Sequence, residues 1–556
     1  MKDIWEPNGP GDDITGVNNY KTSYFWFIEN WNFNNRTDWN ISDRWKLFGR
    51  YSRLRTDLDQ INYTPNNSRA MPNDNGGLMN SRNIAADTVY TINATTILNL
   101  RGSFASLEDD YNAPREAVGE KGLAEIWPSA WYKPYLKDIP AIYYPNISIS
   151  PGGSYGKGSY WVQHPRSYNF SGKLSKIIGK HYLKWGAETR LHRADGIYPF
   201  LMNFAFSPSF TSSTFIGNDT RNTGDAHASF LLGALSGADG QAQLISSQAV
   251  HMNYYSLFVH NDYKLNRRVT LNVGLRWEYE TPPVDEQNRF SRFLDLTNPI
   301  PEMRANPPAI PADVQALRTA PAQFNGAWVF TDDDHRGYYR TEKRVLMPRL
   351  GLALRVNDRT AVQIGYAKYV TPPLVIADTI GRLTFAGFNA RSTTLPSVEG
   401  VPQALLADPF PADRNPLIPA VGKAWGRYTN LGGPASWWQQ DLRTQVNDRF
   451  NFTVQRELRG GFKSDVTFFT NYGKSLPYSK NMNMSDPQLR YTHKAVVDQA
   501  VANPFYRYMT PDTFPGVLRN QVTVRRESLL SPYPQYTGLT QSNTAGPRNR
   551  YRALQM

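Results

Sequence analysis

The chain has 556 residues, a net charge of +13 and a mean hydropathy of −0.54, and 13% of its residues are aromatic. It contains no cysteine, which excludes disulfide bridges, thiol nucleophiles and cysteine-ligated metal sites. No stretch of about 18 apolar residues occurs, which excludes a helical membrane span but not a span made of strands, because barrel strands need apolar side chains only at alternate positions.

Alternating apolar and polar residues recur along the chain, each time as two runs joined by a short turn. A period of two over such lengths predicts β-strands. In chain order, the predicted hairpins surround Ser42–Arg44 and Asn93–Thr95 and then cover Tyr168–Leu191, Tyr254–Glu280, Leu350–Tyr369 and Phe450–Tyr472. Another strand begins at Tyr551–Met556, so we predict about 12 to 13 strands in all.

The hairpin at Tyr254–Glu280 shows the alternation most clearly. Its second strand places Val269, Leu271, Val273, Leu275, Trp277 and Tyr279 on one face and Thr270, Asn272, Gly274, Arg276 and Glu278 on the other. One face is therefore predicted to be apolar and the other polar. Aromatic residues near the strand ends, namely Trp185, Trp277, Tyr279 and Tyr366, are typical of a girdle at a membrane surface.

Long segments rich in Pro, Gly, Asn and Asp separate the hairpins: Leu58–Ala85, Glu108–Ser159, Ala194–Val250, Thr281–Glu342, Thr371–Thr444 and Leu476–Asn549. Soluble sandwiches and propellers have shorter strands and distribute their loops over both ends. Transmembrane barrels instead have short periplasmic turns and long extracellular loops. The sequence therefore predicts an all-β fold, an antiparallel transmembrane β-barrel segment.

The polar face of such a barrel lines its interior, where charged side chains meet water, a plug or a substrate path. We predict that the following charged residues face this lumen: Arg50, Arg101, Glu188, Arg190, Arg276, Glu278 and Arg355. A generic wet lumen and a wall that contacts a plug or substrate both remain open. In the loops, the neighbouring indoles of Trp437 and Trp438 are candidate ligand contacts, on the expectation that they are exposed.

The motifs that could indicate an enzyme lack the context they need. Gly152, Ser154 and Gly156 match a nucleophile elbow, but Pro151 precedes them and no helix pattern follows. The eight histidines form no H-x-x-x-H pair, and the Asp332–Asp334 run before His335 lacks the spacing of a calcium loop. The basic residues are scattered and form no block. We therefore predict no catalytic residue, no metal, no cofactor and no nucleic-acid partner.

Several stretches together resemble the barrel of Oar-like TonB-dependent receptors, which carry a carboxypeptidase-regulatory-like domain ahead of the plug. The stretches that carry the resemblance are Ile41–Ser52 (ISDRWKLFGRYS), Gly179–Arg193 (GKHYLKWGAETRLHR), Ala228–Gly233 (ASFLLG), Tyr255–Tyr279 (YSLFVHNDYKLNRRVTLNVGLRWEY), Asn451–Gly473 (NFTVQRELRGGFKSDVTFFTNYG) and Leu529–Gln555 (LLSPYPQY, then YRALQ). They occur in the family's order and span nearly the whole chain from about Asn18.

The resemblance implies a non-enzymatic receptor or transporter in the bacterial outer membrane, with a plugged barrel of about 22 strands that passes an unknown ligand. The implied partners are outer-membrane lipid, lipopolysaccharide and the TonB complex, which would act through an N-terminal region. On this basis residues 1–556 are expected to be the middle of the barrel, without the signal peptide, the regulatory-like domain, the plug and the C-terminal strands. A secreted all-β glycan-binding module and a passive porin are the alternatives.

Overall fold

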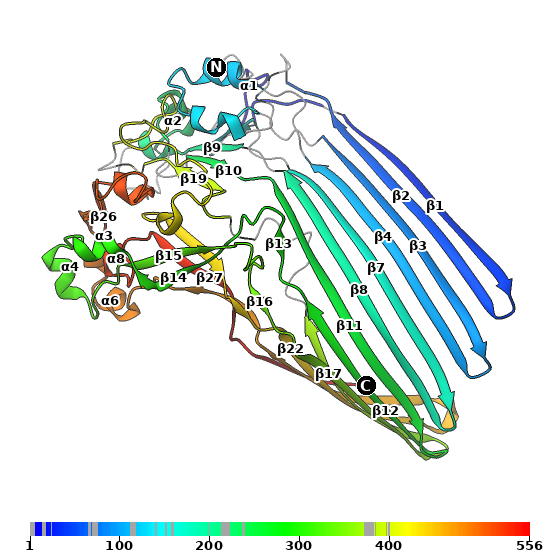
Figure 1. Ribbon diagram of the computed structural model, residues 1–556. Coiled ribbons are helices and arrows are strands. Elements are labelled where there is room, and N and C mark those ends of the chain that lie inside the picture. Colours follow the sequence, from blue (N-terminus) through cyan, green and yellow to red (C-terminus); the bar gives the residue numbers. More distant parts are fainter. Residues whose placement is uncertain are drawn as a thin grey trace.

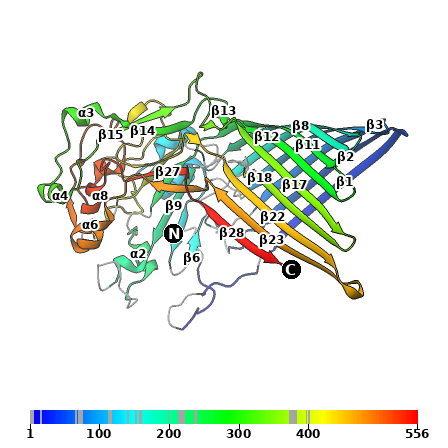
Figure 2. The same ribbon diagram turned by 90° about the horizontal axis from the view of Figure 1, so that it is seen from below.

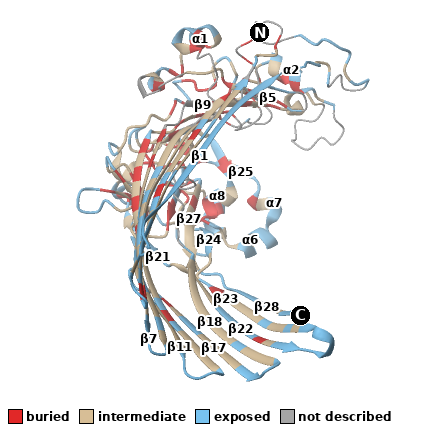
Figure 3. Ribbon diagram, turned by 90° about the vertical axis from the view of Figure 1, so that its right-hand side faces the viewer, coloured by how far each residue is buried: buried red, intermediate tan, exposed pale blue. Residues whose placement is uncertain are grey.

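The computed structural model describes residues 6–13, 18–23, 25–64, 68, 70, 76–111, 118–138, 142–150, 153–156, 161–197, 200–212, 223–235, 240–371, 383, 385–395, 397 and 401–556. Its largest element is an antiparallel sheet of 14 strands in the described residues, curved like a section of a barrel wall (Figures 1 and 3). The strands follow one another in the order β1-β2-β3-β4-β7-β8-β11-β12-β17-β18-β22-β23-β28, and β13 pairs with β11. The all-β, antiparallel fold that we predicted is confirmed.

The strands of this path alternate in direction and are much longer than those of ordinary globular sheets. They are β1 (Trp26–Ser42), β2 (Trp45–Gln60), β3 (Gly77–Asn93), β4 (Thr96–Tyr111), β7 (Trp161–Ile178), β8 (His181–Ile197), β11 (Gln248–Lys264), β12 (Val269–Glu280), β17 (Val345–Asn357), β18 (Thr360–Thr371), β22 (Gln445–Glu457), β23 (Lys463–Lys474) and β28 (Asn549–Gln555). β1 and β28 lie at the two edges of the sheet (Figure 3).

The short turns all lie at one end of the sheet, and the long loops gather at the other (Figures 1 and 2). Local chemistry accounts for the turns. In the β11–β12 turn the Asn266 side chain accepts hydrogen bonds from the amides of Arg268 and Val269, at 2.8 and 2.9 Å. In the β22–β23 turn Gly460 and Gly461 adopt φ values of +81° and +79°, which side chains disfavour.

The strands extend further toward the loops than the alternation in the sequence suggested. β3 begins at Gly77, inside the segment Leu58–Ala85 that we predicted as a loop, and β2 runs on to Gln60. Here Asn80 to Asn83 are polar on both faces of β3. Where both faces of a strand meet water, the strand can continue without an apolar face, and the period of two disappears.

The long loops are folded. They contain the strands β5 (Asn146–Ile149), β6 (Gly153–Tyr155), β9 (Phe200–Phe206), β10 (Gln241–Leu244), β13 (Val284–Asp285), β14 (Ser291–Pro299), β15 (Asn325–Phe330), β16 (Arg340–Thr341), β19 (Ala390–Thr393), β20 (Pro434–Trp438), β21 (Asp441–Leu442), β24 (Pro477–Asn481), β25 (Ala500–Ala502), β26 (Thr523–Arg525) and β27 (Gly538–Ala545). Their short helices are α1 (Gly119–Ile126), α2 (Ala226–Leu231), α3 (Pro301–Ala305), α4 (Ala312–Leu317), α6 (Pro487–Thr492), α7 (Lys494–Val497) and α8 (Arg526–Leu530). In the described residues no helix is long and apolar enough to cross a membrane.

Most of the buried core lies in these loops, and one of its clusters extends onto Ala194 of β8 and Val250 and Met252 of β11. One cluster surrounds Trp127, Trp131 and Phe204, a second surrounds Trp328, Trp437 and Phe505, and a third contains Tyr338, Tyr339 and Trp438. The sheet has an exposed apolar face instead, on which Leu257, Val273 and Leu350 are 55%, 50% and 52% exposed. An apolar face of this extent is typical of a surface that contacts lipid.

Candidate functional site

The candidate site is a group of polar side chains on the face opposite the apolar one. Residues paired across antiparallel strands point to the same side of a sheet. Ser256 of β11 pairs with Glu188 of β8 on one side and with Glu278 of β12 on the other. Since apolar Leu257 and its neighbours occupy the convex face, this polar row lies on the concave face. We call Glu188, Arg190, Tyr254, Ser256, Arg276 and Glu278 the wall cluster.

Arg276 is the centre of the wall cluster. Its Nε donates to Glu278 Oε1 at 2.5 Å, and its Nη2 lies 3.3 Å from Glu188 Oε2. The same Nη2 donates to the hydroxyls of Tyr254 and Ser256 at 2.9 and 3.0 Å. One guanidinium thereby connects three neighbouring strands.

Arg190 completes the charge balance of the cluster. Its guanidinium contacts Glu188 at 2.5 Å and lies over the ring of Tyr254, with the guanidinium carbon 5.0 Å from the ring centroid. The side chain of Arg190 is 47% exposed, whereas those of Arg276 and Glu188 are 22% and 23% exposed. Of the two arginines in the wall cluster, Arg190 is therefore more accessible to a ligand or protein segment than Arg276.

Gly186 makes room for this arrangement. A Cβ at this position would lie 2.4 Å from the carbonyl oxygen of Gly172 and 2.8 Å from the Phe258 ring. Phe258 pairs with Gly186 on one side and with Arg276 on the other. The ring can therefore occupy the space over β8 only because residue 186 has no side chain.

A second polar group lies nearer the short turns on the same face. Asp262 accepts hydrogen bonds from Asn272 at 2.5 Å and contacts His260 Nε2 at 2.7 Å, and Lys184 Nζ lies 3.6 Å from it. We did not select these residues from the sequence as site residues. The alternation predicted Asn272 on the polar face, and this placement was the signal in the sequence that could have pointed to the group.

The structure brings together four of the seven residues predicted to face the lumen: Glu188, Arg190, Arg276 and Glu278. Arg50 lies four strands away from Arg190 in the same register row and donates to Asn83 at 2.7 Å. Arg101 pairs with Asp87 and Ser171 on that face. Arg355 lies at a short turn, where it contacts Asp358 at 2.9 Å, and is separate from the wall cluster.

The expectation that Trp437 and Trp438 are exposed is wrong. They are only 3% and 6% exposed. Successive side chains of β20 point to opposite faces, and each face of this strand packs on a different hydrophobic cluster. Trp438 stacks on Tyr339 with ring centroids 5.8 Å apart and planes within 5°. Both indoles belong to the loop core, and a contact with ligand stays a prediction.

The structure describes part of the G-x-S-x-G motif and the whole of the Asp332–His335 segment, which we predicted not to be catalytic or metal sites. Ser154 lies in β6, while Pro151, Gly152 and Lys157 lie outside the described residues. Asp332 accepts hydrogen bonds from the amide and Nδ1 of His335, at 2.6 and 3.1 Å. These bonds hold the pKa of the Asp332 carboxyl below its usual value, and they close a turn at the surface.

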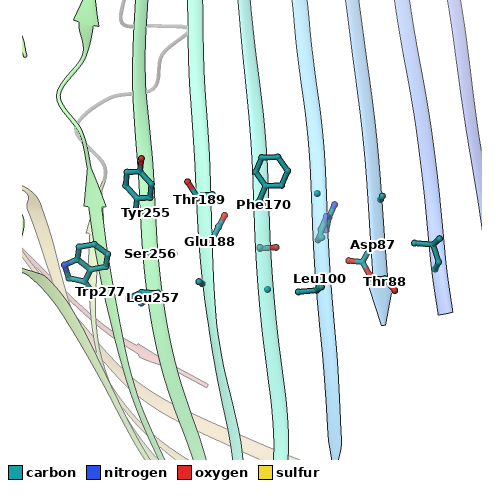
Figure 4. A pocket seen from close by; sticks show the side chains of 17 residues that line it. Asp87, Thr88, Leu100, Phe170, Glu188, Thr189, Tyr255, Ser256, Leu257 and Trp277 are labelled. Carbon is teal, nitrogen blue, oxygen red and sulfur yellow. The ribbon is translucent and has the colours of Figure 1, made fainter. Parts of the chain in front are cut away.

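The convex face carries a shallow apolar hollow of about 770 Å³ (Figure 4). Leu100, Phe170, Tyr255, Leu257 and Trp277 stand around it. Its floor consists of small residues: Ala86, Gly102, Gly172 and Ala187. A hollow lined in this way can hold hydrocarbon. None of the side chains that line it from the convex face is charged.

The two faces therefore differ in what they can bind. The wall cluster presents paired charges and hydroxyls, which can exchange hydrogen bonds with a polar ligand or protein segment inside the barrel. The middle of the convex face carries exposed apolar side chains and is suited to contact an apolar environment. This division is that of a membrane-spanning barrel wall.

Comparison with solved structures finds likeness in fold. The siderophore receptor PirA from Acinetobacter baumannii has 10% identity and a TM-score of 0.41, covering 95% of this chain and 50% of PirA. The outer membrane transporter YddB from Escherichia coli has 11% identity and a TM-score of 0.41, covering 83% and 42%. The hemophore receptor HasR from Serratia marcescens has 10% identity and a TM-score of 0.40, covering 99% and 54%. The chain thus spans about half the length of these structures.

No curated protein matches the chain. Residues 2–556 match the sequence family described as "Outer membrane beta barrel domain". This match covers the strands, the turns and the folded loops alike. The chain belongs to the outer membrane beta-barrel domain family and is a protein of the bacterial outer membrane.

Proposed function

We propose that the chain is a section of the barrel wall of a TonB-dependent receptor of the Oar-like group, which captures a ligand with its outer loops and passes it through a plugged barrel. The observation that carries the proposal is the wall cluster, in which Arg276 joins Glu188 and Glu278 across three strands of the concave face. The sequence blocks described above support the Oar-like assignment.

The proposed mechanism divides the work between loops and wall. The folded loops supply a binding surface with a fixed shape, since most of them contribute side chains to two buried hydrophobic clusters. The wall supplies polar partners below them, with the exposed guanidinium of Arg190 nearest to solvent. Plug, TonB contact and regulatory-like domain are proposed for the whole protein, and lipopolysaccharide is proposed as a partner of its outer face.

The proposed activity is transport without chemical conversion of the ligand. A passive porin is the competing function, because a polar wall alone would also serve diffusion. The two differ in whether the pore is closed at rest and whether passage needs energy.

Conductance and uptake together test the proposal. The protein, produced from its complete gene, should show no stable open-channel conductance in a planar bilayer. In cells, uptake of at least one of four labelled probes, namely a ferric hydroxamate, vitamin B12, maltohexaose and a pentapeptide, should saturate and should stop when a protonophore is added. A permanently open channel with uptake that is insensitive to the protonophore would contradict a receptor and indicate a porin.

A further inference from the structure

A second feature of the convex face lies on β18, β22, β23 and β28, away from the hollow. Three successive register rows cross these strands there. The row nearest the loops is Lys368–Asp448–Tyr472–Arg550, the next is Tyr366–Phe450–Thr470–Arg552, and the third is Ile364–Phe452–Phe468–Leu554. Lys474 follows Tyr472 on the same face of β23. We call Lys368, Lys474, Arg550 and Arg552 the basic patch.

The charge of the basic patch is largely uncompensated. On this face of the four strands, Asp448 is the one carboxylate at that level. Its oxygens are already engaged by Lys474 Nζ at 3.1 Å and by the Tyr366 hydroxyl at 2.9 Å. In the described part of the chain, Arg550 and Arg552 have no carboxylate within ion-pair distance, and both are exposed.

Arginines elsewhere on the convex face provide an internal comparison. On β3 and β7, Arg82 and Arg166 also lie on the loop side of the apolar band. There, however, Arg82 lies 3.5 Å from Glu108, and Arg166 forms an ion pair with Asp195. Among the described residues, Arg82 and Arg166 are therefore each paired with a carboxylate, whereas Arg550 and Arg552 are not.

The level of the basic patch matches that of lipid headgroups. On β28, Arg550 and Leu554 are four residues apart, which corresponds to roughly 13 Å along the strand. Leu554 belongs to the apolar row Ile364–Phe452–Phe468–Leu554. Tyr472 lies in the row of Arg550, and Tyr366 lies in the row between it and the apolar row. Their amphipathic rings favour a membrane interface. Since the long loops of outer-membrane barrels face outward, the patch meets the outer leaflet.

We propose that the basic patch binds the headgroup phosphate of a phosphorylated lipid of the outer leaflet, whose acyl chains lie along Ile364, Phe452 and Phe468. Arginine suits this role because its planar guanidinium offers two parallel donors to a phosphate. The inference rests on the outer-membrane location and deepens the proposed lipopolysaccharide partner by giving it a place. It does not depend on what the barrel transports.

Native mass spectrometry of the full chain in a zwitterionic detergent tests this proposal, with bisphosphorylated lipid A as the probe. Each basic charge near an anionic surface contributes about 1 kcal/mol, or roughly fivefold in affinity. The double variant Arg550→Gln/Arg552→Gln should therefore weaken lipid A binding roughly tenfold or more. The matched control Arg82→Gln/Arg166→Gln should change it less than about twofold. Inorganic pyrophosphate should not compete, which separates a lipid site from a free-phosphate site.

Two results would overturn the proposal. Equal lipid A binding by the double variant and the native chain is the first, and it would assign the arginines to another role, such as protecting the edge strand β28 from pairing with other chains. The second is equal loss in both double variants, which would indicate nonspecific attraction. Unchanged heat-modifiable migration of the variants shows that they fold. Because no uptake is measured, failure here leaves the proposed transport function standing.

Discussion

Arg276 of β12 reaches past the intervening strand β11 to Glu188 of β8, with Nη2 3.3 Å from Oε2. The two residues are 88 positions apart in the chain, and the long segment between β8 and β11 separates their strands. The contact therefore depends on the register of three neighbouring strands, β8, β11 and β12, and not on a local turn. It also explains why both carboxylates can lie so close together on the concave face, because Arg276 is shared between them.

Replacing Arg276 with Met should destabilise the barrel by about 2 kcal/mol, because Glu188 and Glu278 would lose their shared partner while two hydroxyls lose a donor. Urea unfolding in detergent, followed by tryptophan fluorescence, measures the change. Arg355→Met is the control: its ion pair with Asp358 is at an exposed turn and should cost less than about 1 kcal/mol. Equal effects of the two variants would contradict a special role of the wall cluster.

Gly186→Ala should weaken the barrel by about 1–3 kcal/mol, since the added methyl would overlap the Gly172 carbonyl and the Phe258 ring. Gly102→Ala, in β4 of the same sheet two strands away, serves as the control, because its Cβ would meet the Phe170 ring at an ordinary 3.6 Å. The same unfolding assay applies. If Gly186→Ala were as stable as Gly102→Ala, the close packing over β8 would be wrong.

Trp438→Ala should loosen the folded loops by about 3–5 kcal/mol, because it removes a buried indole stacked on Tyr339. Limited proteolysis should then cut the loops faster while the sheet stays intact. Trp425→Ala is a suitable control, since this indole is only partly buried and donates to Asp512 at 3.4 Å. Protease resistance equal to that of the native chain would indicate that Trp438 is not a core residue.

Alkaline pH should destabilise the loop cluster around Tyr135. Burial raises the pKa of Tyr135 to about 12, above the value near 10 of an unfolded tyrosine. The neutral phenol therefore stabilises the fold fully below pH 10, and this contribution, about 2–3 kcal/mol, is lost as the pH rises from 10 to 12. Melting temperatures across this range should fall less steeply for Tyr135→Phe than for the native chain. Tyr491→Phe, at an 85% exposed position, should keep the native pH slope, and identical slopes for all three would refute the assignment.

The sequence predicted those parts of the fold that the membrane imposes. Where hydrocarbon borders one face, as at Val269 to Tyr279, every second residue must be apolar, and the strands and their two faces could be recognised. At Asn80 to Asn83 this requirement ends, so the strand continued unseen. The partners of Arg276 could not be predicted either, because the register of β8 against β11 is set across a long loop.

The tryptophans show a different limit. Trp437 and Trp438 stand between two hydrophobic clusters that are assembled from loops far apart in the chain. Two adjacent tryptophans in a segment rich in Gly and Pro do not indicate a short strand that is buried on both faces. Their burial is a tertiary property, whereas the position of Glu278 on the polar face of its strand follows from strand alternation alone.

The central claim is that alternate side chains of the sheet face lipid and water. Because the chain has no cysteine, single cysteines can carry a nitroxide spin label without background. Labels at Val273 and Leu350 in lipid bilayers should collide mainly with oxygen, which concentrates in hydrocarbon, and labels at Asn272 and Gln363 should collide mainly with a water-soluble nickel chelate. If the labels at Val273 and Leu350 were instead as accessible to the nickel chelate as those at Asn272 and Gln363, the barrel wall described here would be contradicted.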